Sequence, residues 1–409
     1  MDFSVEPALV ERCVEELSRP GRLPSGGLYR GVYTDEWAAA QGIVAEWLAA
    51  SGLAVRRDAV GNLYGRLEGR EGGGAFVTGS HIDTVREGGR YDGALGIIAG
   101  YLAVRLLKER FGQPRRPIEV IATCEEEGSR YHANFWGTRA ITGRIRRDEV
   151  DHLVDATGTP LREAMRSQGL DPDTIDSCRR DDIAGFIELH IEQGKILETE
   201  GVEIGVVETI TGIRHLEAIV EGQADHAGTT PLDLRRDAAL AAAEMTVALT
   251  DAAHQAGRPA VATVGRIETE PGVVNIVAGR ARFTIDVRHP DQAVKQRLLA
   301  AIEERCRNIA ARRGVSLRLT TLIDVEPAPL SGPTADALSQ AAADVQCSHR
   351  RMISGAGHDA QIMAARFPAG MIFVPSRDGR SHTPAEYTAP NQAAQGVEVL
   401  AAALHHLAY

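Results

Sequence analysis

Apolar residues in the first 210 positions alternate between helical and strand spacing. Leu9, Cys13 and Leu17 share one helical face within residues 6–19, and residues 95–112 predict a longer helix with a wide apolar face. Short runs rich in β-branched and apolar residues predict strands at 53–57, 60–67, 75–79, 117–124 and 183–194. This alternation predicts an α/β fold built on a mostly parallel sheet with helices on both faces.

The pattern changes near residue 210. Residues 213–322 predict a strand, an Ala-rich helix, two strands, a second helix and a final strand, a βαββαβ-like order in roughly 110 residues. Helices and strands of the first type then resume at 332–345, 349–353, 369–375 and 391–408. We therefore expect one domain made of residues 1–210 and 326–409, interrupted by an inserted α+β domain of residues 211–325.

Composition supports a soluble globular chain of two domains, because 409 residues exceed what one core usually holds and 44% of them are hydrophobic. The net charge of -11, without any Lys/Arg block, excludes nucleic acid as an expected partner. No apolar run approaches the roughly 18 residues of a membrane span. The N-terminal residues lack the pattern of a signal peptide, and the five cysteines are scattered, so we expect free thiols and a cytoplasmic protein.

The first candidate chemistry follows the strand at 75–79. His81 comes directly after an apolar run, Asp83 lies two residues later, and Asp92 occupies a turn flanked by glycine. Imidazole and carboxylate groups are preferred ligands of zinc and similar divalent metals. By themselves these residues are weak evidence for a metal site, because a His near an Asp is more often an ordinary hydrogen-bonded pair.

Three further strand ends carry the same kinds of side chain. Glu125, Glu126 and Glu127 follow the strand at 117–124, and His190 and His382 lie at or after the ends of two other strands. Each has a simpler explanation: a solvated acidic loop for the glutamates, which would otherwise repel each other, and a structural role for each histidine. Their convergence at strand ends indicates the site of a paired-metal hydrolase.

Seven motifs then carry a specific resemblance: GSHIDTV…DGALG, EEEGSR, ELHIEQG, DHAGTTPLDLRRDA, VNIVAG…FTIDVRH, SGAGHDAQ and SHTPAEYT. In this order they resemble the hydantoinase/carbamoylase amidase family, part of the M20-type superfamily of dinuclear aminoacylases and carboxypeptidases. The resemblance implies hydrolysis of the ureido (N-carbamoyl) C–N bond of a small ureido acid, with release of ammonia and carbon dioxide. Allantoate and N-carbamoyl-L-amino acids are the two implied substrates, and HAGTTPLDLRRDA, SGAGHDAQ and EPAPL favour allantoate.

The resemblance also implies two divalent metal ions in the interrupted, catalytic domain. Asp92 would bridge them, with His81 and His190 completing the protein ligands of one ion, and Glu127 and His382 those of the other. Three imidazoles and two carboxylates suit zinc first, with manganese, cobalt or nickel as alternatives.

Glu126 is the implied general base, which would take a proton from the attacking water and pass it to the leaving nitrogen. Glu125 is the alternative, and the sequence does not separate the two. Asp83 is expected to hydrogen-bond His81 and fix its tautomer.

The implied substrate pocket contains Gln193, Arg214, His226, Asn275, Arg288, Gly357 and His358. The planar guanidinium of Arg288 suits a substrate carboxylate, although a solvated surface arginine is the simpler alternative. Asn275 and Gln193 resemble amide contacts to the carboxylate and the ureido group. His226 would stabilise the tetrahedral oxyanion from the neighbouring subunit, so the resemblance implies a homodimer and an inserted domain that acts as a closing lid.

Two alternatives remain for the function. An N-acyl-amino acid deacylase or peptidase of the same superfamily would use the same metal ligands. A metal-binding protein without catalysis is the second alternative, but it predicts a missing base or ligand, whereas this chain retains the whole set.

Overall fold

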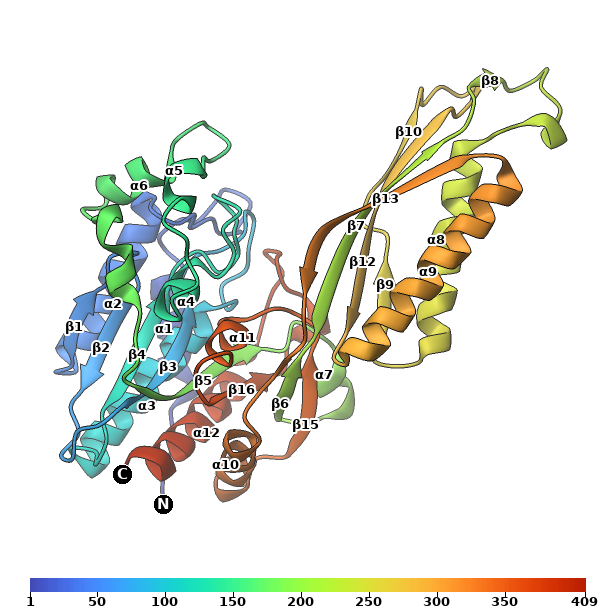
Figure 1. Cartoon of the computed structure of the whole chain (residues 1–409). Coiled ribbons are helices and arrows are strands. Elements are labelled where there is room, and N and C mark those ends of the chain that lie inside the picture. Colours follow the sequence, from blue (N-terminus) through green and yellow to red (C-terminus); the bar gives the residue numbers. More distant parts are fainter. The chain divides into compact units, whose positions relative to one another are not determined.

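The computed structural model describes residues 1–409, which form two compact units (Figure 1). The large unit comprises Met1–Glu208 and Pro329–Tyr409, and the inserted unit comprises Thr209–Ala328. Compared with the expected boundaries, residues 209–210 and 326–328 belong to the inserted unit. No helix in the chain combines the length and apolar character needed to cross a membrane.

The large unit is built on a nine-stranded sheet with the strand order β1-β2-β4-β3-β5-β16-β6-β14, in which β15 also pairs with β6. Its strands are β1 (Ala54–Arg57), β2 (Leu63–Leu67), β3 (Ala75–His81), β4 (Ile118–Thr123), β5 (Ile183–Ile191), β6 (Ile204–Ile210), β14 (Ala328–Pro329), β15 (His349–Ser354) and β16 (Ala369–Val374). Its helices are α1 (Pro7–Leu17), α2 (Asp35–Ala50), α3 (Ala94–Phe111), α4 (Trp136–Ile141), α5 (Glu149–His152), α6 (Leu161–Ser167), α7 (Ile196–Glu200), α10 (Gly332–Asp344), α11 (Asp359–Met363) and α12 (Pro390–Ala408), with short 3₁₀ turns η1 (Pro172–Cys178) and η3 (Arg377–Gly379).

Four parallel strands form the centre of this sheet. β4, β3, β5 and β16 pair in parallel, whereas β1 with β2, β2 with β4, and β6 with β16 pair antiparallel. Every residue of β3, β4 and β16 is buried, as expected of strands that are covered on both faces. The predicted α/β fold with a mostly parallel sheet is confirmed.

Helices cover both faces of the sheet, as two neighbouring residues of β5 show. The side chain of Leu189 faces α12, where it lies against Gly396. Successive side chains of a strand point to opposite faces, and the carboxylate of the preceding residue, Glu188, accepts a hydrogen bond from the main-chain N–H of Ala360 in α11 (2.8 Å). α12 and α11 therefore lie on opposite faces.

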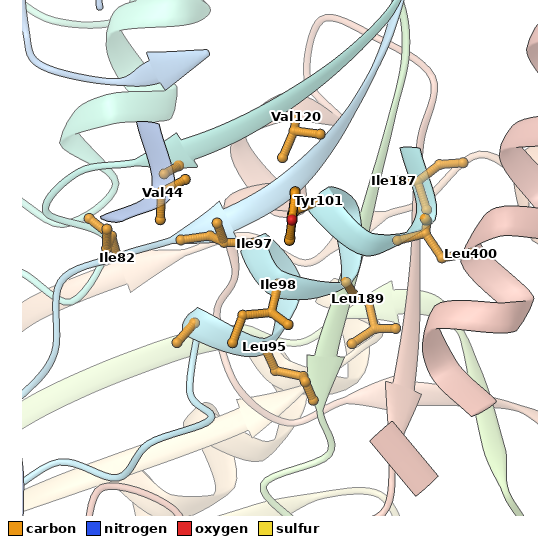
Figure 2. Packing of buried hydrophobic residues seen from close by; sticks show 14 of the residues in the cluster. Val44, Ile82, Leu95, Ile97, Ile98, Tyr101, Val120, Ile187, Leu189 and Leu400 are labelled. Atoms are coloured by element: carbon orange, nitrogen blue, oxygen red, sulfur yellow. The ribbon is translucent and has the colours of Figure 1, made fainter. Parts of the chain in front are cut away.

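Helix α3 carries much of the core on the α12 face. Figure 2 shows side chains of α3 packed with those of β4, β5 and α12: Leu95, Ile97, Ile98, Tyr101, Val120, Ile187, Leu189 and Leu400. Burying one such aliphatic side chain contributes about 1.5–3 kcal/mol. Gly112, with a φ of 75°, follows the last residue of the helix, in agreement with the predicted end.

The inserted unit has its own sheet and its own core. Its elements are β7 (Gly212–Glu221), β8 (Asp225–His226), η2 (Leu232–Leu234), α8 (Ala238–Ala256), β9 (Val261–Thr263), β10 (Ile267–Glu270), β11 (Ile276–Val277), β12 (Arg280–His289), α9 (Gln292–Arg313) and β13 (Ser316–Val325). Alternate residues of β12 are buried, and they pack under α8 and α9. A separate antiparallel ribbon joins β8 to β11.

Several elements lie outside the predicted set. Strand β6 and the short helices α4, α5, α6, α7 and α11 were not expected from the sequence. A helix of four to seven residues contains at most two turns, which is too few for an apolar repeat to be recognised. These short helices lie in the connections between the longer elements, where local spacing carries little information.

The close approach of α3 to the sheet depends on Gly96. A Cβ at this position would lie 2.5 Å from the carbonyl oxygen of Leu189 and 2.7 Å from Cβ of Ser80. We expect Gly96→Ala to push the helix from the strands and lower the free energy of unfolding by about 1–3 kcal/mol. Gly42→Ala in α2 is the matched control, since a Cβ there meets nothing within 4 Å, and it should raise stability by about 0.5–1 kcal/mol. Urea denaturation of both variants measures the difference, and equal stabilities would contradict it.

Candidate metal centre

The candidate residues of the large unit lie at the carboxyl-terminal edge of the four parallel strands. His81 is the last residue of β3, His190 lies next to the end of β5, Glu126 and Glu127 follow β4, and His382 follows β16. Because the carboxyl ends of parallel strands share one edge, side chains far apart in the sequence meet there.

Asp92 lies among three imidazoles. Its Oδ1 is 3.1 Å from Nε2 of His190 and 3.5 Å from Nε2 of His81, while its Oδ2 is 3.1 Å from Nε2 of His382. Nε2 of His382 is also 3.4 Å from Oε1 of Glu127. The structure thus forms two ligand sets, His81/Asp92/His190 and Asp92/Glu127/His382, each with its ligand atoms within 4.8 Å of one another. Asp92 belongs to both sets, and each of its oxygens faces one of them.

Main-chain carbonyls orient two of these imidazoles. Nδ1 of His81 lies 3.0 Å from the carbonyl oxygen of Asp83, and Nδ1 of His190 lies 3.0 Å from that of Ile191. A carbonyl oxygen can only accept, so Nδ1 carries a proton in each ring, and in the neutral form of the ring Nε2 presents a lone pair. The N–H of Gly93 donates to Nε2 of His190 (3.2 Å), which agrees with this tautomer. Neutral imidazoles in this form are ready to bind a metal.

Asp83 makes a different contact from the one expected. Its main-chain carbonyl orients His81, whereas its carboxylate Oδ1 lies 3.9 Å from Nδ1 of that ring. The carboxylate instead accepts the N–H of Glu126 at Oδ1 (3.1 Å) and the N–H of Glu127 at Oδ2 (3.2 Å). These two amides are otherwise without a partner at a turn, and satisfying both takes precedence over the imidazole. Asp83 therefore positions the acidic loop as well as His81.

The three consecutive glutamates point in different directions. Oε1 of Glu125 accepts the N–H groups of Arg130 (3.1 Å) and Tyr131 (2.8 Å), so its carboxylate closes the loop that follows β4. Oε2 of Glu126 lies 3.9 Å from Nε2 of His81, and Glu126 and Glu127 form a further possible ligand group with that histidine. The geometry thus distinguishes Glu125, which faces its own loop, from the two residues that face the imidazoles.

Unusual backbone conformations accompany this arrangement. Glu125, Gln193 and His382 each adopt a positive φ, of 52°, 57° and 56°, directly after strands or in the loop that carries the site. Such conformations are disfavoured for residues with a Cβ and persist where the surroundings impose them. Gly93, with a φ of 64°, permits a closer contact, because a Cβ there would lie 2.5 Å from the ring of His81.

Burial and like charge dominate the electrostatics of the acidic groups. Burial, followed by repulsion from Asp83, raises the pKa of Glu125 to about 8, and burial with repulsion from Asp92 raises the pKa of Glu127 to about 7. Burial also raises the pKa of Glu126 well above its usual range. Burial would raise the pKa of Asp92 too, but the adjacent imidazoles of His190, His382 and His81 hold it well below its ordinary value.

The pKa values of two histidines are raised as well, because neighbouring carboxylates outweigh the effect of burial. Burial lowers the pKa of His81, but the carboxylates of Glu126, Asp92 and Asp83 outweigh this and raise it well above the ordinary value. The hydrogen bond to Asp92 raises the pKa of His382 to about 9. Buried carboxylates and imidazoles therefore compensate one another only in part, and divalent cations would satisfy both, because they neutralise carboxylates and bind neutral imidazoles. The donor set fits a pair of divalent metal ions.

Three of the predicted pocket residues lie in the large unit. Nε2 of Gln193 donates to Oδ2 of Asp92 (3.0 Å) and to Ser381 (3.1 Å), while its buried Oε1 has no hydrogen-bond partner. His358 is buried, with its ring 4.5 Å from that of His190. Burial, then the charge of His190, holds the pKa of His358 well below its ordinary value. Gly357 precedes His358 next to Phe135, whose ring a Cβ would approach to 3.0 Å.

The other four lie in the inserted unit. His226 in β8 pairs with Ile276 in β11, and the N–H of Ala227 donates to the carbonyl oxygen of Asn275 (3.0 Å), so His226 and Asn275 share one exposed ribbon. Nδ1 of His226 accepts the N–H of Gly228 (3.0 Å), which leaves Nε2–H as a donor in the neutral ring.

The two arginines of the inserted unit form ion pairs. Arg288 in β12 donates through Nη2 to Asp286 (2.8 Å), and Arg214 in β7 pairs with Asp324. Each pair is partly exposed, so a bound anion would compete with a carboxylate of this chain for the guanidinium.

Three polar residues of this region were missed in the sequence. Glu386 accepts the N–H of Asp92 (3.0 Å), Ser381 lies 3.0 Å from Oδ2 of Asp92, and Glu188 accepts the hydroxyl of Ser80 (2.6 Å). Glu188 is fully buried in β5, two residues before His190, and an acidic residue inside an apolar strand was a usable signal. Glu386 and Ser381 lie in the SHTPAEYT motif, but nothing in their spacing pointed to Asp92.

A fold of parallel strands that ends in clustered carboxylates and imidazoles defines an α/β enzyme with a candidate two-metal centre. The chain belongs to peptidase family M20/M25/M40, whose family model matches residues 77–406.

Comparison with individual proteins refines this assignment. The chain is 42% identical to the allantoate amidohydrolase of Escherichia coli (strain K12), with 98% of each chain covered. It is 40% identical to the N-carbamoyl-L-amino-acid amidohydrolase of Paenarthrobacter aurescens, over 97% of this chain and 98% of the relative. Among solved structures it resembles a hydantoinase/carbamoylase family amidase from Burkholderia multivorans, with a TM-score of 0.94 and 32% identity over 99% of this chain and 98% of that one. The predicted family, and a hydrolase acting on carbon–nitrogen bonds other than peptide bonds, are confirmed.

The shifted pKa values predict how the stability of the metal-free chain depends on pH. Glu125, Glu127 and His382 have folded pKa values of about 8, 7 and 9, all above their ordinary values of 4.5, 4.5 and 6.5. The folded chain therefore holds more protons than the unfolded chain, and the free energy of unfolding should fall as pH rises from about 4.5 to about 9.

Chemical denaturation of protein from which a chelator has removed the metal, repeated across this pH range, measures the change in the free energy of unfolding. Saturation with a divalent cation should make the free energy of unfolding depend less on pH, because the bound cation stabilises the ionised carboxylates. A metal-free chain whose stability rises with pH over this interval would contradict these electrostatics.

Proposed function

We propose that this protein is a metal-dependent amidohydrolase that cleaves the ureido C–N bond of a small ureido acid, releasing ammonia and carbon dioxide. The observation that carries the proposal is Asp92, whose two oxygens face two different sets of candidate metal ligands. The relatives named as allantoate and N-carbamoyl-L-amino-acid amidohydrolases support the ureido substrate.

His81, Asp92 and His190 would hold one metal ion, and Asp92, Glu127 and His382 the other. Bound divalent cations would supply Lewis-acid polarisation of the ureido carbonyl and lower the pKa of a water molecule at the site. Imidazole and carboxylate ligands suit zinc first, with manganese, cobalt and nickel as alternatives. The chain fixes the ligands itself, since carbonyl groups hold two of the imidazoles in the tautomer that presents Nε2.

Glu126 is the proposed general base. Its carboxylate faces the imidazoles, its pKa is raised, and the carboxylate of Asp83 anchors its main-chain N–H. A base with a raised pKa can accept a proton from water and return it to the leaving nitrogen near neutral pH. Glu125 is less suited, because its carboxylate is engaged by two amides of the loop.

Substrate contacts are proposed for both units. The unpaired Oε1 of Gln193 beside Asp92 suits a ureido N–H, and Gly357 and His358 are proposed to line the same pocket. Arg288 and Asn275, with Arg214 as a further anion contact, would bind the carboxylate. His226 offers an Nε2–H donor for the oxyanion, because Nδ1 is occupied by Gly228.

We expect Glu126→Gln to lower kcat by about 10²–10⁴-fold, because the amide cannot accept the proton. The variant should retain the metal content of the wild type, measured by elemental analysis. Glu125→Gln is the matched control, because its amide oxygen can still accept the N–H groups of Arg130 and Tyr131, and it should lose much less activity. A larger loss of activity in Glu125→Gln than in Glu126→Gln would indicate that Glu125 is the general base.

The substrate is tested by a panel of ureido acids. The chain is 42% identical to an allantoate amidohydrolase and 40% identical to an N-carbamoyl-L-amino-acid amidohydrolase, so sequence identity does not distinguish the two substrates. The measurement that does so compares kcat/KM on allantoate with kcat/KM on N-carbamoyl-L-methionine. We expect the protein to hydrolyse one of these two ureido acids, with allantoate the favoured one. Exhaustive chelation should abolish this activity. Hydrolysis confined to N-acyl-amino acids or dipeptides, or full activity of the metal-free chain, would refute the proposal.

We also propose a cytoplasmic homodimer whose inserted unit acts as a lid and supplies His226 to the partner's site. The exposed β8–β11 ribbon, which carries His226 and Asn275, supports this assignment. Mixing His226→Ala with Glu126→Gln protein should restore part of the activity, since a mixed dimer has one site with both native residues. Absence of rescue in a mixture shown to exchange subunits would argue that each chain completes its own site.

A further inference from the structure

A second carboxylate, Glu386, holds the backbone that presents Asp92. Its Oε1 accepts the N–H groups of Tyr91 (2.8 Å) and Asp92 (3.0 Å). Glu386 is only 3% exposed. Its carboxyl group packs so closely against Gly89 that a Cβ at position 89 would overlap it. A buried carboxylate with two adjacent main-chain donors fixes the orientation of the turn they belong to.

The other oxygen of Glu386 connects the same turn to the segment that carries His382. Oε2 accepts the hydroxyl of Ser381 (2.8 Å), and that hydroxyl also lies 3.0 Å from Oδ2 of Asp92. Ser381 directly precedes His382, whose φ of 56° places it in a strained conformation. One carboxylate therefore contacts the main chain at position 92 and the residue next to His382.

These contacts span the chain. Tyr91 and Asp92 follow β3, whereas Ser381 and Glu386 follow β16, so two segments far apart in sequence are joined at the point where Oδ2 of Asp92 faces Nε2 of His382 at 3.1 Å. No other carboxylate is hydrogen-bonded to the main-chain N–H groups of Tyr91 and Asp92. Without Glu386, two buried N–H groups would lose their acceptor, and the two segments would lose their shared partner.

We propose that Glu386, acting with Ser381, is the positioning residue that holds Asp92 and His382 in the relative positions required by the Asp92/Glu127/His382 ligand set. The inference rests on the proposed two-metal function. It assigns Glu386 neither a metal nor a substrate, and its effect acts through Asp92.

Titration of the metal-free protein with cobalt(II), followed by calorimetry and by the visible absorption of the bound ion, tests this role. The wild type should bind about two equivalents. Glu386→Ala should bind one of them about 10–100-fold more weakly, with a changed cobalt spectrum, as expected when a group that orients a ligand is removed. Glu386→Gln retains an oxygen for the N–H groups of Tyr91 and Asp92 and should recover most of the affinity.

Glu203→Ala is the control for loss of a structural carboxylate. Oε2 of Glu203 accepts the N–H (2.7 Å) and hydroxyl (3.0 Å) of Ser348, away from the site, so this variant should lose stability and keep both the cobalt affinity and the spectrum. If Glu386→Ala does not fold, Ser381→Ala decides, and it should weaken the same equivalent and shift the spectrum. Wild-type affinity and spectrum in a folded Glu386→Ala, or in Ser381→Ala, would overturn the assignment. A wild-type chain that binds no cobalt would instead overturn the proposed function, and with it any need for the positioning role.

Discussion

The site depends on the presentation of one buried carboxylate, that of Asp92, to imidazoles on two sides. Its oxygens lie 3.1 Å from His190 on one side and 3.1 Å from His382 on the other. Taking such groups out of water is costly unless charge and hydrogen bonds are satisfied. Two neighbouring residues provide such contacts. Glu386 accepts the main-chain N–H of Asp92, and Gly93 lets the ring of His81 approach where a Cβ would not fit.

The same requirement explains why three consecutive glutamates can follow β4. Asp83 accepts the N–H groups of Glu126 and Glu127, and Glu125 turns back to accept two amides of its own loop. Each carboxylate thus has a separate task. Their raised pKa values reflect the cost of burial in the metal-free chain, which bound cations would offset, so metal binding and local stability are linked.

The two units contribute different kinds of structure. The large unit places His81 and His190 at the ends of buried strands, where packing restricts their movement, whereas His382 lies half-exposed in the loop after β16. The inserted unit offers His226 and Asn275 on an exposed ribbon with its own short pairing. The candidate metal ligands and the exposed ribbon therefore belong to two separately folded units, each with its own hydrophobic core.

Sequence alone determined the order of the long elements, the residues at four strand ends and the family, because strand and helix periodicity, turn glycines and short motifs are local properties. It did not reveal β6, the short helices, the carboxylate contacts of Asp83, or the roles of Glu188 and Glu386. Local spacing also left Glu125 and Glu126 equivalent, and only the loop hydrogen bonds distinguish them. The contact between Glu386 and Asp92 joins segments that follow β16 and β3, and no local pattern encodes such a pairing. Tertiary structure decided it, because only packing of the parallel strands brings their carboxyl ends, and the unsatisfied N–H groups beside them, to one edge.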